Sequence, residues 1–125
     1  MNCPKCNGHM ETIKLEDIQV DRCTACEGLW FDLREHEHLK GMPGSERVDT
    51  GDPARGHQQD AIREVKCPKC HTPLIRMVFP DQPHIRYEMC STCHGIYLDA
   101  GEFVDFKRKT LAERVRHALA PLMQR

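Results

Sequence analysis

Eight cysteines form four Cys-x-x-Cys pairs in this chain of 125 residues. The pairs fall into two sets, Cys3/Cys6 with Cys23/Cys26 and Cys67/Cys70 with Cys90/Cys93. Two thiolates at this spacing span one edge of a tetrahedron, so two such pairs complete a closed four-thiolate site of the kind that zinc prefers in structural roles. The sequence therefore predicts two Zn²⁺ ions per chain, with all eight cysteines as ligands.

Iron and disulfides are the competing uses of these cysteines. Four thiolates also hold iron in a rubredoxin-like electron carrier, and the sequence alone leaves this alternative open. Disulfides are disfavoured, because we expect no secretory leader and no apolar run reaches about 18 residues. We therefore expect a cytoplasmic protein in a reducing compartment, where thiolates bind metal instead of pairing with one another.

The segments that follow the second pair of each set repeat one another. Gly28-Leu29-Trp30-Phe31-Asp32 recurs as Gly95-Ile96-Tyr97-Leu98-Asp99, and Glu35 recurs as Glu102, all at an offset of 67 residues. The first pairs are offset by 64 residues, so the second copy is three residues longer between its pairs, at the turn 80–83. The chain is a tandem duplication of one unit.

Each unit needs the same few elements to position its cysteines. Alternating apolar residues predict a hairpin around the turn 16–17 and a longer one around the turn 80–83, and short apolar runs at 29–31 and 96–98 predict third strands. Asp32 and Asp99, each followed three residues later by a glutamate, predict helix starts. The predicted fold class is a small metal-stabilised α+β protein of two zinc ribbons, because units of about 40 residues need the metal as their core.

The remaining chain divides into a linker and a tail. Residues 41–65 lack large apolar residues until Ile62, so we expect a flexible linker between the units at 1–40 and 66–106, which would then fold independently. Apolar residues recur at helical spacing from Phe103 to Leu122, which predicts an extended C-terminal helix. Residues 107–125 form its basic amphipathic part.

The charge distribution indicates where partners could bind. The net charge is −1, yet residues 107–125 carry six basic residues and one acidic residue. The hypothesis is nucleic-acid binding by this tail, through Lys107, Arg108, Lys109, Arg114 and Arg116. The alternative is a protein partner or self-association through the 103–122 helix; no membrane and no small-molecule substrate are expected.

The two runs CPKC…CTACEGLWFDLREHEHL and CPKC…CSTCHGIYLDAGEF resemble the transcription factor IIB-type zinc finger family of small zinc ribbons. The family signature is CPxC followed by CxxC-x-G-[IL]-W-[FL]-D-x-x-E, and it covers approximately residues 3–39 and 67–106. Tyr97 departs from it, standing where the family favours tryptophan. The resemblance implies a zinc-ribbon fold with four cysteine ligands per unit, and favours zinc over iron.

Other side chains with chemical potential receive structural interpretations. A closed four-thiolate site has no open position for water, so the carboxylates of Asp32/Glu35 and Asp99/Glu102 are interpreted as helix caps and no enzymatic activity is expected. His36 and His38 are interpreted as surface residues, and Trp30 and Tyr97 as packing residues, not base-stacking platforms. The function predicted is a zinc-binding, nucleic-acid- or transcription-associated module, with a protein adapter and a thiol redox or zinc sensor as alternatives.

Overall fold

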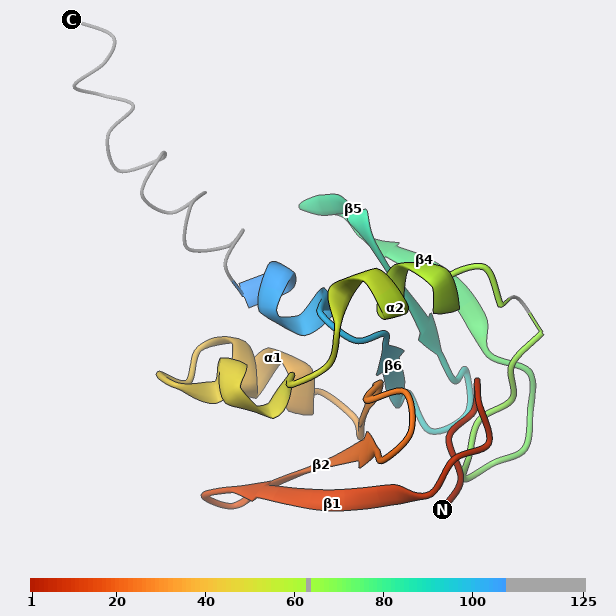
Figure 1. Ribbon diagram of the computed structural model, residues 1–125, viewed down its shortest axis with the longest axis horizontal. Helices are drawn as coiled ribbons and strands as arrows, with labels where there is room; N and C mark the ends of the chain where they lie inside the picture. Colours follow the sequence, from red (N-terminus) through yellow and green to blue (C-terminus); the bar gives the residue numbers. More distant parts are fainter. Residues whose placement is uncertain (63, 108–125) are drawn as a thin grey trace, which may run out of the picture.

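The computed structural model describes residues 1–62 and 64–107 (Figure 1). The first repeat (residues 1–40) contains β1 (Met10–Leu15), β2 (Ile18–Cys23), β3 (Leu29–Phe31) and α1 (Glu35–Lys40). The segment between the repeats contains the 3₁₀ helix η1 (Ser45–Val48) and α2 (Pro53–Gln59). The second repeat (residues 66–106) contains β4 (Ile75–Phe79), β5 (Gln82–Met89) and β6 (Ile96–Leu98), and residues 102–107 are helical. The rest of the predicted C-terminal helix lies outside the described residues.

The six strands form one sheet in the order β1-β2-β3-β6-β5-β4. The two repeats meet at its centre, where β3 pairs with β6 in the antiparallel direction and Trp30 lies opposite Tyr97. Each repeat therefore contributes one half of the sheet, with equivalent strands at equivalent distances from the central pair. The two units therefore have a fixed relative orientation, which a flexible linker between them would not require.

Both predicted hairpins and both third strands are present. Leu15 pairs with Ile18 across the two-residue turn 16–17, and in the second repeat Phe79 pairs with Gln82. The next pair in that hairpin is Val78 with Arg86, so the register shifts between Val78 and Phe79. A bulge of this kind places additional residues on one strand only, which is how the longer second copy keeps the same sheet.

The central strands are buried on both faces, in keeping with their uninterrupted apolar sequences. Because side chains alternate along a strand, Leu29 and Phe31 lie on one face of the sheet and Trp30 on the other. The first face packs against the helices and includes Leu39, Val48, Phe103 and Phe106. The second face is an aromatic and sulfur layer made of Trp30, Tyr97 and cysteines from both repeats.

The described residues of the segment 41–65 pack against the repeats instead of forming the flexible linker that the sequence predicts. Val48 is 1% exposed and belongs to the core of the helical face. Gly56 lies so close to Ala100 that a Cβ atom at this glycine would be 2.0 Å from the Ala100 carbonyl oxygen. The absence of large apolar residues predicted a linker, but the segment packs through small residues and backbone contacts, which need no large apolar side chains.

The helix caps also differ from the prediction. Asp49, from the segment between the repeats, accepts hydrogen bonds from the backbone N–H groups of Gly101 (2.8 Å) and Val104 (3.1 Å) and thereby caps the last helix. In the first repeat Glu35 accepts a bond from the Asp32 backbone N–H at 3.3 Å, as a capping box requires, although helix α1 itself begins at Glu35. The side chains of Asp32 and Asp99 have other partners, described below.

Candidate metal centres

The first site brings together the thiols of Cys3, Cys6, Cys23 and Cys26, which all lie within 4.8 Å of one another. The sulfur atoms of Cys3 and Cys26 are 3.7 Å apart, and those of Cys6 and Cys23 are 3.3 Å apart. Backbone N–H groups of Gly8, Ala25 and Cys26 donate to two of these sulfur atoms at 3.4 Å. The loops before β1 and before β3 supply these donors, as expected for two turns that close around one ion.

The second site is made of Cys67, Cys70, Cys90 and Cys93 under the same distance limit. The sulfur atoms of Cys67 and Cys93 are 3.8 Å apart. Four backbone N–H groups donate to Cys67 and Cys90, and the Thr72 hydroxyl lies 3.6 Å from the sulfur of Cys90. All eight cysteines are free thiols, so no disulfide competes with the two sites.

Both sets of thiols fit zinc. Four sulfur atoms at the usual Zn–S length of about 2.3 Å lie about 3.8 Å from one another in a tetrahedron, close to the separations given above. A hydrogen bond from Cys3 lowers the pKa of Cys26 to about 4. Burial opposes ionisation of Cys90, but backbone N–H groups and Thr72 lower its pKa to about 6. Each set therefore contains a thiol that is ionised near neutral pH, and zinc bound there supplies a structural cross-link.

One aromatic residue from the opposite repeat packs beside each site, Tyr97 beside the first and Trp30 beside the second. The Tyr97 hydroxyl lies 3.5 Å from the sulfur of Cys3 and 3.4 Å from that of Cys26, in the first site. Gly28 makes room for this ring, since a Cβ atom there would be 1.8 Å from the Tyr97 hydroxyl oxygen. Gly95 makes room for the Trp30 ring in the same way, since a Cβ atom at Gly95 would be 2.3 Å from the nearest atom of that ring.

Trp30 and Tyr97 are each 0% exposed, as the packing interpretation requires. Burial raises the pKa of Tyr97 above its ordinary value, so the hydroxyl is neutral and can donate. The sequence identified the packing role but not the partner, because duplication reveals equivalent positions without revealing which repeat each aromatic ring contacts.

Two lysines inside the cysteine pairs make a second reciprocal connection. Lys5 lies between Cys3 and Cys6, and its Nζ pairs with Asp99 at 2.8 Å and with Glu88 at 3.0 Å, both in the second repeat. Lys69, the equivalent residue of the second repeat, pairs with Asp32 of the first. Asp32 and Asp99 therefore bind the opposite repeat, in addition to lying near the start of a helix.

A third group of ligand-type side chains lies beside Lys5. Carboxylate oxygens of Asp60, Asp99 and Glu102 lie within 4.8 Å of one another. Lys5 and Arg76 already pair with this group, and burial raises the pKa of Asp99 to about 7 and that of Glu102 to about 9. Cationic side chains and bound protons therefore balance these carboxylates, and the group is an ion-pair network that joins the repeats.

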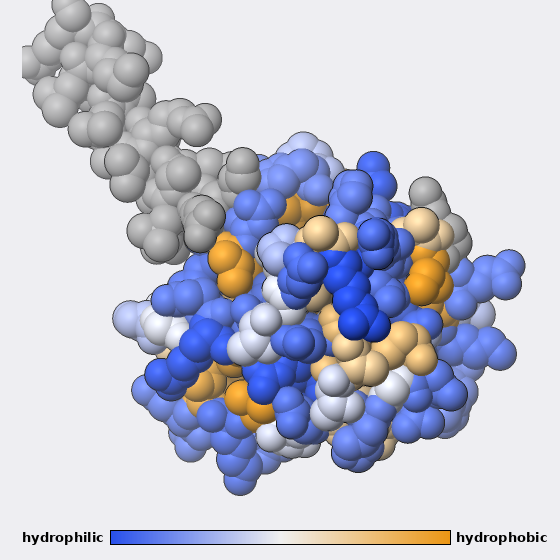
Figure 2. Space-filling view, viewed as in Figure 1, coloured by the Kyte–Doolittle hydropathy of each residue, from blue (hydrophilic) through white to orange (hydrophobic). Residues whose placement is uncertain are grey.

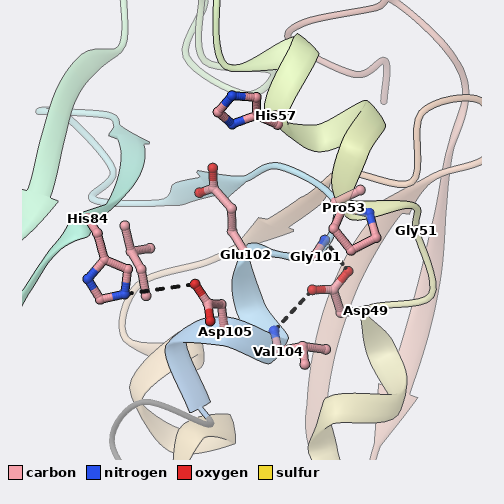
Figure 3. A pocket seen from close by; sticks show the side chains of 11 residues that line it. Asp49, Gly51, Pro53, His57, His84, Gly101, Glu102, Val104 and Asp105 are labelled. Atoms are coloured by element: carbon pink, nitrogen blue, oxygen red, sulfur yellow. Dashed lines mark hydrogen bonds and ion pairs between the residues drawn. The ribbon is translucent and has the colours of Figure 1, made fainter.

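Glu102 also lines a cavity of about 400 Å³ next to α2 (Figure 3). Its carboxylate lies between His57 and His84, and His84 forms a 3.8 Å ion-pair contact with Asp105 on the cavity wall. The cavity is open, and its polar groups come from the second repeat and from the segment between the repeats. Sequence reasoning missed this cavity, because nothing in the spacing of these residues connects them.

Histidines are not members of the two four-cysteine groups. His9, His71 and His94 are exposed, whereas His36, predicted at the surface, is buried against the rings of Phe31, Phe79 and Phe106. Burial lowers the pKa of His36, which favours its neutral form. The surface interpretation was wrong for His36 because this residue lies on the face of α1 that also buries Leu39.

Lys107 is buried, which corrects its assignment to an exposed basic surface. Its Nζ donates to the Met42 carbonyl oxygen (2.5 Å), the Ser45 hydroxyl (2.8 Å) and the Glu46 carboxylate (2.6 Å). Phe103 and Phe106 are likewise part of the core. The first turns of the predicted partner-binding helix therefore bind the protein's own helical face. Arg108, Lys109, Arg114 and Arg116 lie outside the described residues.

The visible surface in Figure 2 is mainly hydrophilic, with small separate apolar areas. Among residues 1–62 and 64–107 the larger exposed apolar side chains include Ile75, Met77 and Val78 on the edge strand β4. No helix in the described part of the chain is long and apolar enough to span a membrane.

Comparison with known proteins agrees with the geometry of the two sites. The transcription factor zinc-finger family matches residues 2–41 and again residues 66–109, so both repeats and both sets of cysteines are covered. No curated protein and no solved structure matches the chain. The matched ranges, the two four-cysteine clusters and their fit to zinc lead to one conclusion: the chain belongs to the transcription factor zinc-finger family, as two tandem zinc ribbons.

Proposed function

We propose that this protein is a non-enzymatic module that binds nucleic acid through the basic segment 108–125, for which the two zinc ribbons provide a rigid support. The observation that carries the proposal is the division of charge along the chain. Residues 1–107 carry a net charge of −5 and residues 108–125 a net charge of +4. Binding to a phosphate backbone requires a positive surface, and this segment is where basic residues concentrate.

The geometry of the ribbons supports this assignment over binding by the ribbons themselves. Stacking on bases requires exposed aromatic rings, and Trp30 and Tyr97 are both covered by the opposite repeat. Lys5 and Lys107 are held by buried partners. The absence of catalysis is part of the proposal and is supported by the donor sets, since four thiolates complete the coordination of zinc and leave no position for a reacting water.

The test is fluorescence anisotropy with labelled single-stranded and duplex DNA and RNA across a range of salt concentrations. We expect binding whose affinity falls steeply as salt rises, because each phosphate contact releases counterions. Replacing Arg108, Lys109, Arg114 and Arg116 with glutamate should abolish it, while zinc content stays at two per chain.

A matched control reverses three exposed charges on the ribbons and α2, with Lys14→Glu, Arg55→Glu and Lys66→Glu. We expect this variant to bind less than threefold more weakly than the wild type at physiological salt, since it alters only the long-range potential. Equal losses in the two variants, or binding that does not respond to salt, would contradict the proposal.

A further inference from the structure

The two zinc sites have equivalent ligands but different surroundings. In the first site Cys3, Cys23 and Cys26 are buried and only Cys6 is partly exposed. In the second site Cys67 and Cys90 are buried, whereas Cys70 and Cys93 are partly exposed. The second site therefore has two partly exposed cysteines, and the first site has one.

The aromatic residues that reach across the sheet increase this difference. Tyr97 places a hydroxyl between the sulfur atoms of Cys3 and Cys26. A zinc-bound cysteine is a thiolate and has no proton to donate, so the tyrosine is the donor, and its single O–H is shared between the two sulfur atoms. Trp30 occupies the equivalent place against Gly95, but its indole N–H donates to Asp32 at 3.3 Å. The second site has a hydroxyl donor of its own, Thr72, which belongs to the same repeat.

The ion pairs made by Lys5 and Lys69 also differ in exposure, and the pair beside the second site is the more exposed one. The side chains of Lys5 and Asp99 are 0% and 1% exposed, whereas those of Lys69 and Asp32 are 43% and 40% exposed. An exposed pair contributes little to holding a loop in place, but a buried pair cannot separate without leaving charges unsolvated. The first cysteine pair of the first repeat is therefore held against the second repeat by a buried ion pair, while the ion pair at its counterpart is solvated.

From these three differences we propose that the two zinc ions are inequivalent: Tyr97 and the Lys5–Asp99 pair of the opposite repeat lock the zinc of the first site, and the second site holds an exchangeable zinc. The first zinc then exchanges slowly as long as the second repeat stays folded. The second zinc is available to zinc-binding molecules and to thiol-reactive electrophiles, which is the chemistry of a zinc-responsive site. This inference does not depend on nucleic-acid binding.

Zinc isotope exchange followed by native mass spectrometry tests the proposal without emptying either site. The natural protein is incubated with excess isotopically enriched Zn²⁺, and the mass of the intact two-zinc protein is followed with time. We expect two phases of one zinc each, the first at least tenfold faster than the second. A single phase that replaces both ions at one rate would overturn the proposal.

Three conservative variants assign the phases to sites. Tyr97→Phe removes only the hydroxyl and should accelerate the slow phase about tenfold. Loss of a residue that hydrogen-bonds to a metal ligand usually weakens metal binding by at least about this factor. Thr72→Ala should accelerate only the fast phase. Tyr87→Phe is the matched control, since this buried tyrosine stacks on Phe79 in the other core layer, and it should change neither phase. An unchanged slow phase in Tyr97→Phe would overturn the role of the hydroxyl.

Alkylation by N-ethylmaleimide gives a second, independent readout. A thiolate adds to the maleimide double bond, a carbon–sulfur bond forms, and the adjacent carbon takes a proton from water, after which the modified sulfur no longer holds zinc as a thiolate. Peptide mapping at less than a tenth of complete reaction should find Cys70 and Cys93 modified about tenfold more than any cysteine of the first site. Equal early modification of Cys6 and Cys93 would count against the proposal.

Discussion

Glu102 is a carboxylic acid that the fold keeps protonated at neutral pH. Burial raises its pKa to about 9, and the nearby carboxylates Asp99, Asp60 and Glu88 act in the same direction while Lys5 opposes them. Its Oε2 atom has no hydrogen-bond partner among the described residues. A residue that resembles an N-terminal helix cap in the sequence is thus a member of the network that joins the repeats.

The protonation of Glu102 predicts a falling stability with rising pH. In the unfolded chain this carboxyl ionises near its ordinary pKa of 4.5, but in the folded chain it does so only near 9. Between these values the folded state binds more protons, so the free energy of unfolding decreases as pH rises. Glu102→Gln should flatten this slope and raise the free energy of unfolding at pH 8 by about 1–2 kcal/mol.

Chemical denaturation at several pH values between 6 and 9 measures this slope with zinc present. Glu64→Gln, at an exposed position near the second site, is the control and should leave the slope as it is. A Glu102→Gln protein with the pH dependence of the wild type would show that the carboxyl is ionised in the fold.

Lys107 gives a second prediction for a single residue. Lys107→Glu would place a carboxylate against the Met42 carbonyl and the Glu46 carboxylate, in a site that now holds a buried ammonium. We expect it to lower the free energy of unfolding by about 1–3 kcal/mol, because the Met42 carbonyl and the buried Ser45 hydroxyl lose the ammonium that donates to them. Thermal denaturation measures the loss, and Lys14→Glu at an exposed position of β1 should change stability by less than about 0.5 kcal/mol.

The elements themselves were largely predictable from the sequence. Alternation over two residues located the hairpins, and the uninterrupted runs Leu29–Phe31 and Ile96–Leu98 located the central strands. The segment between the repeats was not predictable, because η1 and α2 dock through Gly51, Gly56 and Asp49. Glycine and aspartate are typical of loops, so the residue preferences of this segment predicted a linker. In the structure the same glycines allow the backbone of the segment to pack closely against the second repeat.

The docking of α2 can be tested at one glycine. Gly56→Ala adds a methyl group 2.0 Å from the Ala100 carbonyl oxygen, so α2 must move away from the second repeat. We expect a loss of about 1–3 kcal/mol in the free energy of unfolding, the usual range for overpacking. Gly41→Ala is the matched control, because its nearest neighbour would be 3.9 Å away, and it should be neutral or slightly stabilising. Equal stabilities of the two variants would show that α2 is not tightly docked.

At the scale of the whole molecule, the cysteine ligands could be read from the sequence and the pairing of the repeats could not. Spacing identifies which thiols share a zinc, since that relation is local to each repeat. The pairing depends on contacts between residues about 70 to 95 positions apart, such as Trp30 with Tyr97 and Lys5 with Asp99. Within a single repeat the aromatic residues can be explained by packing and Asp99 by helix capping. The sequence pattern therefore did not indicate that they also contact the opposite repeat.

The joined sheet predicts that the two repeats unfold together, contrary to the independence expected from the sequence. Cys90→Ser removes a ligand of the second zinc, and loss of that zinc should release β6, because a unit of about 40 residues depends on its metal. Without β6 the first repeat loses the partner of β3, the Tyr97 hydroxyl at its own zinc site and the buried partner of Lys5.

We therefore expect Cys90→Ser to collapse the dispersion of amide resonances from β1, β2 and β3 in a ¹H–¹⁵N correlation spectrum, although no residue of the first repeat has changed. Thr92→Ser, an exposed substitution in the same cysteine loop, should leave the spectrum intact. If the resonances of residues 1–40 keep their wild-type positions in Cys90→Ser, the first repeat is stable alone, and the contacts across β3 and β6 contribute orientation but not folding.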